Sequence, residues 1–145
     1  MSNNYPQSIA ELDLDAVELA PEIIAAVKRF ARSKPYRGSI PERIEKFRKA
    51  VNDICRAAGV EPPRLIIVPN ELQSSGNSCC IPALETIILR GRLSVITALH
   101  EVGHLLFGPS EHRACAWSLR LFRDLFPRSW SRLNFQGHMA TVQRS

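Results

Sequence analysis

Apolar residues recur every three or four positions in several stretches of the chain, the spacing that places them on one face of an α-helix. The clearest stretch starts at the capping box Ser39-Ile40-Pro41-Glu42 and ends at Gly59. Its apolar stripe consists of Ile44, Phe47, Val51, Ile54 and Ala58. Residues 8–31 also read as helical, but Pro21 interrupts them, so we expect two short helices or a kink there.

Two more helical stretches follow one another in the second half of the chain. Residues 92–107 carry an apolar stripe and end at Gly108-Pro109, with Gly in the capping position and Pro after it. A further helix is predicted over residues 110–126, capped by Ser110 and ended before Pro127. The turn between them is so short that the two helices are expected to pack as an antiparallel hairpin.

Strands are predicted between these helical stretches. Residues 64–68 and 85–90 are short runs rich in branched apolar residues, and residues 79–81 form a third, weaker run. The order of helices, then strands, then a helical hairpin is typical of an α+β domain. We expect its sheet to be small and mostly antiparallel.

Length and composition fit one globular domain. We expect a single domain over residues 1–145, with its core in residues 39–127 and a weakly patterned tail in residues 128–145. No stretch approaches about 18 uncharged apolar residues, and the N-terminus lacks a signal-peptide pattern, so we expect a cytoplasmic protein without a membrane span. The four cysteines form no C-x-x-C pair, which argues against a structural Cys₄ zinc site.

The net charge is +5, and its excess is concentrated in arginines in the last third of the chain: Arg113, Arg120, Arg123, Arg128, Arg132 and Arg144. A solvated basic helix face explains this pattern, and attraction to nucleic acid or to an acidic protein is the alternative. Because no recognised DNA-binding motif accompanies the arginines, a weak nucleic-acid association is the most that they indicate.

Candidate chemistry is concentrated in His100-Glu101-Val102-Gly103-His104, inside the predicted helix 92–107. Two histidines four residues apart lie on the same side of a helix, where each can offer a ring nitrogen to one Zn²⁺. Glu101 would lie beside the metal, in the place of a general base. This H-E-x-x-H pattern indicates a zinc metallopeptidase. The simpler explanation is an amphipathic helix with two incidental histidines.

A catalytic zinc site needs a third protein ligand, and the predicted hairpin restricts the choice. The candidates are Glu111, His112, Cys115, Asp124 and His138. Folding at the short turn brings residues 111–112 opposite His104 and residue 115 near His100, whereas residue 124 lies several turns away. Glu111 continues the apolar stripe of the second helix and His112 points about 100° away. We therefore prefer Glu111 as the third ligand, with His112 as the alternative.

These motifs resemble those of the ImmA/IrrE-type minimal gluzincins. The pattern of that family is H-E-x-x-H, then E-x-x-A-x-x-F-A-x-x-L-L ahead of a proline. Here the second motif is Glu111-x-x-Ala114-x-x-Trp117-Ser118-x-x-Leu121-Phe122, before Pro127. The resemblance covers residues 85–127. The spacer between the motifs is shorter than is usual in the family, and Trp117-Ser118 replace the common Phe-Ala.

The resemblance implies a zincin-like fold, in which N-terminal helices and a small sheet precede the H-E-x-x-H helix and an antiparallel glutamate helix. It implies zinc held by His100, His104 and Glu111, with Glu101 as the base of a metalloendopeptidase that cuts a protein or peptide. The family includes repressor-cutting proteases of mobile elements and regulators of stress responses. A slow, specific regulatory protease of a prokaryote or mobile element is therefore expected. The alternative is a non-catalytic zincin-fold regulator that associates with nucleic acid or a protein partner.

Substrate contacts are harder to predict than the ligands. If residues 85–90 form an edge strand, a peptide could pair with it, and Arg90 and Glu85 would flank the cleft. A peptidase also needs a hydrogen-bond donor to the carbonyl oxygen of the bond that it cuts. Tyr5 and Tyr36 both lie far upstream of the motif, which leaves His138 as the possible donor. Loss of such a donor lowers rates by roughly 10²–10³, which agrees with a slow protease.

Overall fold

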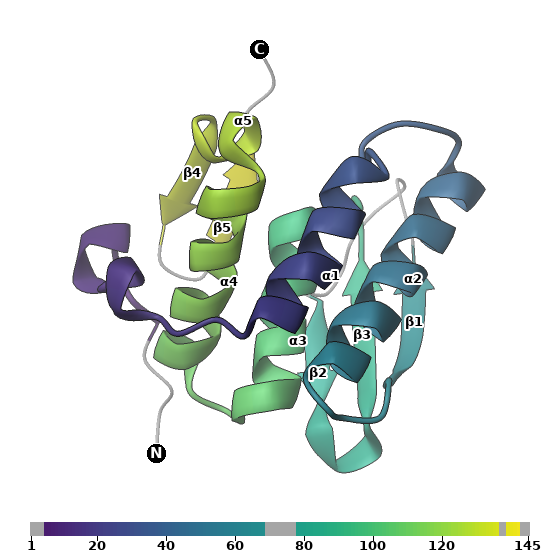
Figure 1. The fold of residues 1–145 in the computed structure, drawn as a ribbon, viewed down its shortest axis with the longest axis horizontal. Helices are drawn as coiled ribbons and strands as arrows, with labels where there is room; N and C mark the ends of the chain where they lie inside the picture. The colour runs from purple at the N-terminus through teal and green to yellow at the C-terminus, as the bar shows by residue number, and fades with distance from the viewer. Residues whose placement is uncertain (1–4, 69–77, 137–138, 143–145) are drawn as a thin grey trace.

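The computed structural model describes residues 5–68, 78–136 and 139–142. Its helices, sheet and terminal hairpin are shown in Figure 1. The fold is α+β, as expected from the order of the predicted elements. No helix among these residues is long and apolar enough to cross a membrane.

The N-terminal stretch is less helical than its sequence pattern predicts. Only α1 (Pro21–Arg32) is an α-helix, and Pro21 occupies its first turn, where a missing N–H does no harm. Before it, the chain forms two 3₁₀ turns, η1 (Ile9–Glu11) and η2 (Leu14–Ala16). The buried side chains in this stretch are Leu12 and Leu14, two positions apart, a spacing that suits a turning chain rather than a helix.

Helix α2 (Ile40–Ala57) confirms the predicted capping box. The Glu42 N–H donates to Ser39 Oγ at 3.3 Å, and the Ser39 N–H donates to Glu42 Oε1 at 2.8 Å. Phe47, Val51 and Ile54 of its apolar stripe are buried against the rest of the molecule. Helices α1 and α2 pack on each other, and α1 contributes to the same buried core as α2.

The main sheet is mixed, which corrects the expectation of a mostly antiparallel one. It has the order β1-β3-β2, formed by β1 (Arg64–Val68), β2 (Cys79–Ile81) and β3 (Thr86–Arg90). Strand β1 pairs parallel with β3, with Leu65 opposite Ile87, while β2 pairs antiparallel with β3. The single turn η3 (Pro82–Leu84) and Glu85, in the left-handed region at φ 48°, reverse the chain between β2 and β3.

This order also rules out the possibility that residues 85–90 form an edge strand to which a peptide could add. Strand β3 lies between β1 and β2, so both of its sides are paired. Glu85 belongs to the turn before the strand rather than to the strand itself. The edge strand on the side of the antiparallel pair is β2, which also contacts the following helix α3.

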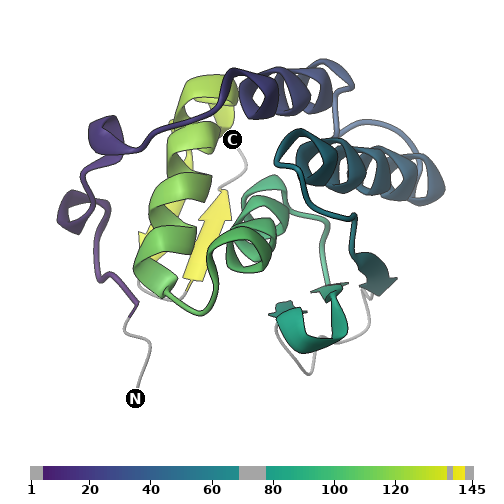
Figure 2. The same cartoon turned by 60° about the horizontal axis from the view of Figure 1, so that its bottom comes forward.

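Helices α3 (Val95–Phe107) and α4 (Glu111–Leu125) form the predicted hairpin. Helix α3 begins three residues after the predicted start, because Ser94 caps it by accepting the Thr97 N–H at 3.3 Å. In Figure 2, α3 lies in the middle of the molecule, between α4 and the sheet. Gly108, at φ +87°, ends α3, and Ser110 caps α4.

The C-terminal residues contain more secondary structure than the weakly patterned tail that the sequence predicts. Pro127 starts the short helix α5 (Pro127–Trp130) directly after α4 ends. The chain then forms an antiparallel hairpin of β4 (Leu133–Gln136) and β5 (Met139–Val142). Each strand has only four residues, too few for a clear alternating pattern.

Candidate metal centre

The packing of α3 on α4 determines where the candidate ligands meet. Gly103 of α3 faces Ala114 of α4 so closely that a Cβ on Gly103 would lie 3.1 Å from Ala114 Cα. This spot lies between the H-E-x-x-H residues and the start of α4. A residue without a side chain therefore lets the two helices approach where His100 and His104 must meet Glu111.

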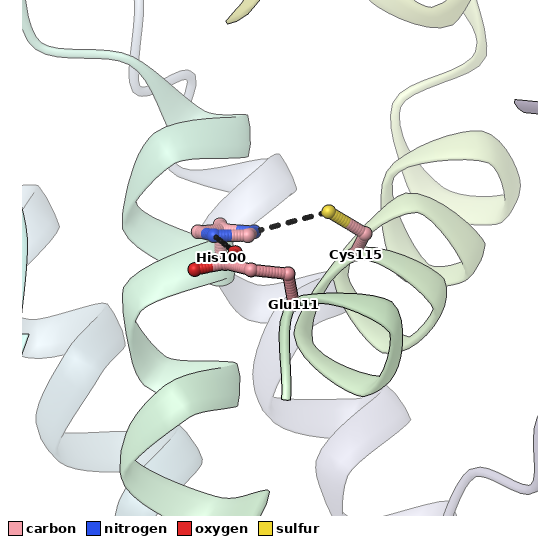
Figure 3. A group of neighbouring side chains, drawn as sticks. All are labelled: His100, Glu111 and Cys115. Carbon is pink, nitrogen blue, oxygen red and sulfur yellow. Dashed lines mark hydrogen bonds and ion pairs between the residues drawn. The ribbon is translucent and has the colours of Figure 1, made fainter. Parts of the chain in front are cut away.

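Three of the predicted ligands converge across this contact. Glu111 Oε1 lies 3.0 Å from His100 Nε2 and 3.1 Å from His104 Nε2. Separations of 3.0 and 3.1 Å are short enough for the oxygen and each nitrogen to bind one ion at the usual zinc distances of 2.0–2.1 Å. Figure 3 shows Glu111 reaching from α4 toward His100 on α3. The side chains of all three residues are largely buried.

The hydrogen bonds of His104 fit a bound cation. Its Nδ1 lies 2.9 Å from the carbonyl oxygen of Gly108, which can only accept, so Nδ1 carries a proton. Its Nε2 faces the Glu111 carboxylate, which also accepts. If Nε2 held a metal, Nδ1 would be left to donate to this carbonyl, the arrangement usual for metal-bound histidine.

Glu111 is held as a carboxylate. Burial by itself would raise its pKa, but the hydrogen bond from His100 and the charges of His104 and His100 outweigh burial and lower the pKa. An ionised carboxylate with two imidazoles on one of its oxygens is a donor set suited to zinc.

Cys115 is a further potential donor, which groups with His100 and Glu111 but not with His104. Its Sγ lies 3.7 Å from His100 Nδ1, and Figure 3 shows it reaching from α4 to that ring. The ligand atoms of His100, Glu111 and Cys115 all lie within 4.8 Å of one another. Burial raises the pKa of the Cys115 thiol to about 12, and the charges of Glu111 and Glu101 add to this. In the metal-free protein, Cys115 is therefore a neutral thiol next to His100.

Glu101, the predicted base, is buried, with 7% of its surface exposed. Burial raises the pKa of its carboxyl to about 7. The nearby charges of His100 and His104 lower this pKa, whereas the charge of Glu111 raises it. In the metal-free protein, Glu101 therefore exchanges its proton near neutral pH. Glu101 lies close enough to all three candidate ligands for their charges to act on its carboxyl.

Tyr5 is the residue that the sequence interpretation missed. It lies close enough to Glu111 for the charge of that side chain to act on the Tyr5 phenol, although more than 100 residues separate the two in the sequence. Burial raises the pKa of the Tyr5 phenol, and the charges of Glu111 and Glu101 raise it further. No local pattern marks Tyr5, because its position depends on how the N-terminal segment crosses α4.

The other predicted residues lie elsewhere. His112 is exposed on α4, and Asp124, at the opposite end of that helix, accepts from Arg120 Nε at 2.7 Å. Glu85 and Arg90 are exposed at the two ends of β3. Tyr36 lies beside Ser129, with a hydroxyl contact of 3.4 Å. His138 lies outside the described residues.

No protein-family model, no curated protein and no solved structure matches this chain. Two imidazole nitrogens, a carboxylate and a neighbouring buried carboxyl fit a zinc ion better than Mg²⁺ or Ca²⁺, which prefer oxygen ligands throughout.

Proposed function

We propose that this chain is a zinc-dependent metalloendopeptidase of the ImmA/IrrE-type minimal gluzincin class. The observation that carries the proposal is the meeting of His100 Nε2 and His104 Nε2 at one oxygen of Glu111, 3.0 and 3.1 Å away. Ala114 and Trp117, which continue the second motif, are buried on α4. The second motif thus lies on the buried face of α4, which presents Glu111 to the histidines.

Glu101 supplies the acid–base chemistry. Zinc held by His100, His104 and Glu111 would lower the pKa of a bound water to about 7 and polarise a peptide carbonyl. Glu101, buried next to these ligands, accepts a proton from water as it attacks and later donates it to the leaving amine. A purely structural zinc site has no need of such a carboxyl, so Glu101 favours a catalytic role.

A peptide substrate would pair with β2 rather than with β3. Strand β2 has its partner β3 on one side, and no other described strand pairs with its outer side. It packs against α3, and the charge of Glu101 contributes to raising the pKa of Cys80 on this strand. An extended peptide added to β2 would therefore run past the metal centre, with its backbone aligned by strand hydrogen bonds.

The alternative, a nucleic-acid-associated regulator, gains little from the arrangement of the basic residues. Arg120 is bound to Asp124 and to the carbonyls of Leu14 and Val17. Arg123 pairs with Asp15 and Asp124. These arginines attach the N-terminal segment to α4. This structural role accounts for two of the arginines in the basic C-terminal third without a nucleic acid. All four cysteines are free thiols, in agreement with the reducing cytoplasm where we expect the protein to act.

The test is proteolysis by the zinc-loaded protein. Purified wild-type chain and Glu101→Gln would be incubated with a denatured proteome, with and without a chelator, and new peptide termini would be identified by mass spectrometry. We expect chelator-sensitive cleavage by the wild type alone, with equal zinc in both proteins, because Gln keeps the shape of Glu101 but not its basicity. Equal cleavage by both proteins would contradict the role of Glu101, and zinc binding without cleavage would favour the regulator.

A further inference from the structure

The two histidines of the candidate centre have hydrogen-bond partners of different kinds. His104 Nδ1 donates to Gly108 O, a backbone atom of the turn after α3, at 2.9 Å. His100 Nδ1 lies 3.7 Å from Cys115 Sγ, which belongs to a side chain of α4. Within the part of the chain that the structure describes, His100 Nδ1 has no other hydrogen-bond partner. The hydrogen bonding of this nitrogen therefore depends on a single side chain.

Helix α4 contacts both nitrogens of the His100 ring. Glu111 Oε1 lies 3.0 Å from Nε2, and Cys115 Sγ, one turn further along the helix, lies 3.7 Å from Nδ1. Figure 3 shows both side chains reaching from α4 to the ring. The ring is thus held by two residues of one helix, with Nε2 directed toward the carboxylate and Nδ1 toward the sulfur.

The close packing of α3 on α4 keeps the sulfur in this place. Cys115 directly follows Ala114, whose Cα would lie 3.1 Å from a Cβ on Gly103. Cys115 itself is only 3% exposed and belongs to the hydrophobic core. Because the packed core restricts the Cys115 side chain, its sulfur is a fixed point for the histidine on the neighbouring helix.

A metal held at Nε2 leaves His100 with a proton on Nδ1, and this proton needs an acceptor. An acceptor in a fixed position holds the ring in one tautomer and one orientation, so less side-chain freedom is lost when the metal binds. Removal of such partners typically lowers metal affinity by roughly 10–100-fold. Because sulfur is a weak acceptor, we expect the lower end of this range for Cys115.

We propose that Cys115 is a positioning residue of the zinc centre: its sulfur accepts a hydrogen bond from His100 Nδ1 and holds the ring with Nε2 directed at the metal. Cys115 acts through His100 and does not bind the metal itself. This role rests on the proposed zinc site, but it concerns the His100 ring and metal affinity and needs no knowledge of the substrate.

The test compares wild type, Cys115→Val, Cys115→Ala and Cys55→Ala. Cys115→Val keeps most of the buried volume but removes the acceptor, and Cys55→Ala is a matched control at another buried cysteine, on α2. Zinc dissociation constants would be measured by competition with a chromophoric chelator. Nitrogen-15 NMR of the histidine rings in the zinc-loaded proteins would report the Nδ1–H of His100, and the spectrum of the Co²⁺-loaded proteins would report any bond from metal to thiolate.

We expect both Cys115 variants to lose about tenfold in zinc affinity and to show a shifted, faster-exchanging His100 Nδ1–H signal, with Cys55→Ala unchanged. Wild-type affinity and signal in Cys115→Val would overturn the proposal, because any loss in Cys115→Ala would then come from packing alone. A thiolate-to-cobalt band in the wild type that both Cys115 variants lack would also overturn it, by making Cys115 a ligand.

The same experiment separates this role from the proposed function. If the wild type bound no zinc, the proposed function would fail and the role of Cys115 with it. A zinc-binding wild type with an unaffected Cys115→Val leaves the proposed function intact and removes only the positioning role.

Discussion

Substitution of Gly103 by Ala tests the close contact between α3 and α4 that brings the ligands together. The added Cβ would lie 3.1 Å from Ala114 Cα, and 3.3 Å from Ala114 Cβ and Ala114 O. Carbon atoms pack best at about 3.5–4.0 Å. Because the nearest atom belongs to the backbone of α4, the helices have to separate by about 0.4 Å to restore normal contact.

Two opposing effects determine the change in stability. Ala is favoured over Gly inside a helix by about 1 kcal/mol, whereas an extra methyl group in a packed contact costs about 1–3 kcal/mol. We therefore expect Gly103→Ala to change the free energy of unfolding by between about 0 and 2 kcal/mol, in the destabilising direction. Zinc binding should be affected more than stability, since Glu111 lies one turn before Ala114 on the helix that is pushed away. We expect a loss of zinc affinity of about tenfold.

The assay combines urea unfolding of the metal-free protein with zinc competition titrations. Ala114→Gly and the double variant complete a mutant cycle. Ala114→Gly alone weakens α4 by about 1 kcal/mol, but it also removes the Cβ contact at 3.3 Å. The double variant should therefore be more stable than the sum of the single changes predicts. A Gly103→Ala protein that is more stable than the wild type by about 1 kcal/mol, the helical preference of Ala over Gly, and that keeps wild-type zinc affinity would refute the close contact.

Two further predictions concern the other buried groups of the centre. Burial raises the pKa of Glu101 from 4.5 to about 7, so the folded metal-free protein binds an extra proton between these values and loses stability as pH rises through this window. Glu101→Gln removes this loss, so its free energy of unfolding should exceed that of the wild type by about 3 kcal/mol at pH 8 and differ little from it near pH 4.5. The measurement is urea unfolding in the presence of chelator, and parallel pH profiles of the two proteins would contradict the burial effect. Cys115→Ala should keep one zinc per chain and lose at most about tenfold in affinity, because Cys115 Sγ lies beside His100 Nδ1, whereas the nitrogen that faces Glu111 is Nε2; an empty site, measured by metal analysis, would make Cys115 a ligand.

Helix positions were the most predictable part of the fold. The amphipathic stripes and their capping residues are local features, and the predicted caps Ser39 and Ser110 both accept the backbone N–H that their positions imply. The strand runs 64–68 and 79–81 were also found correctly. Local signals of this kind depend on the sequence within one element, which is why the sequence alone reveals them.

Pairing between elements was less predictable. The parallel pairing of β1 with β3 depends on the path of the chain between them, and strand composition does not encode it. The same holds for the hairpin of β4 and β5, whose short strands carry little pattern. For residues 8–20, single acidic and apolar residues suggested a helix, but the spacing of Leu12 and Leu14 favours turns.

The candidate centre likewise contains residues that local sequence patterns predict and one that they do not. His100, Glu101, His104 and Glu111 were predicted because motif spacing and a short hairpin determine their neighbourhood. Tyr5 was set aside as too far upstream, since its approach to Glu111 depends on the anchoring of the N-terminal segment on α4. Contacts between distant segments of this kind have no signature in a single sequence.

The most direct test of the account is the zinc content of Glu111→Ala and His112→Ala, measured side by side with the wild type after zinc loading and dialysis. The two residues are neighbours on α4, but Glu111 meets both histidines and His112 is exposed. We predict one zinc per chain in the wild type and in His112→Ala, and an empty site in Glu111→Ala. A zinc-free His112→Ala beside a loaded Glu111→Ala would contradict the account and assign the third ligand to His112.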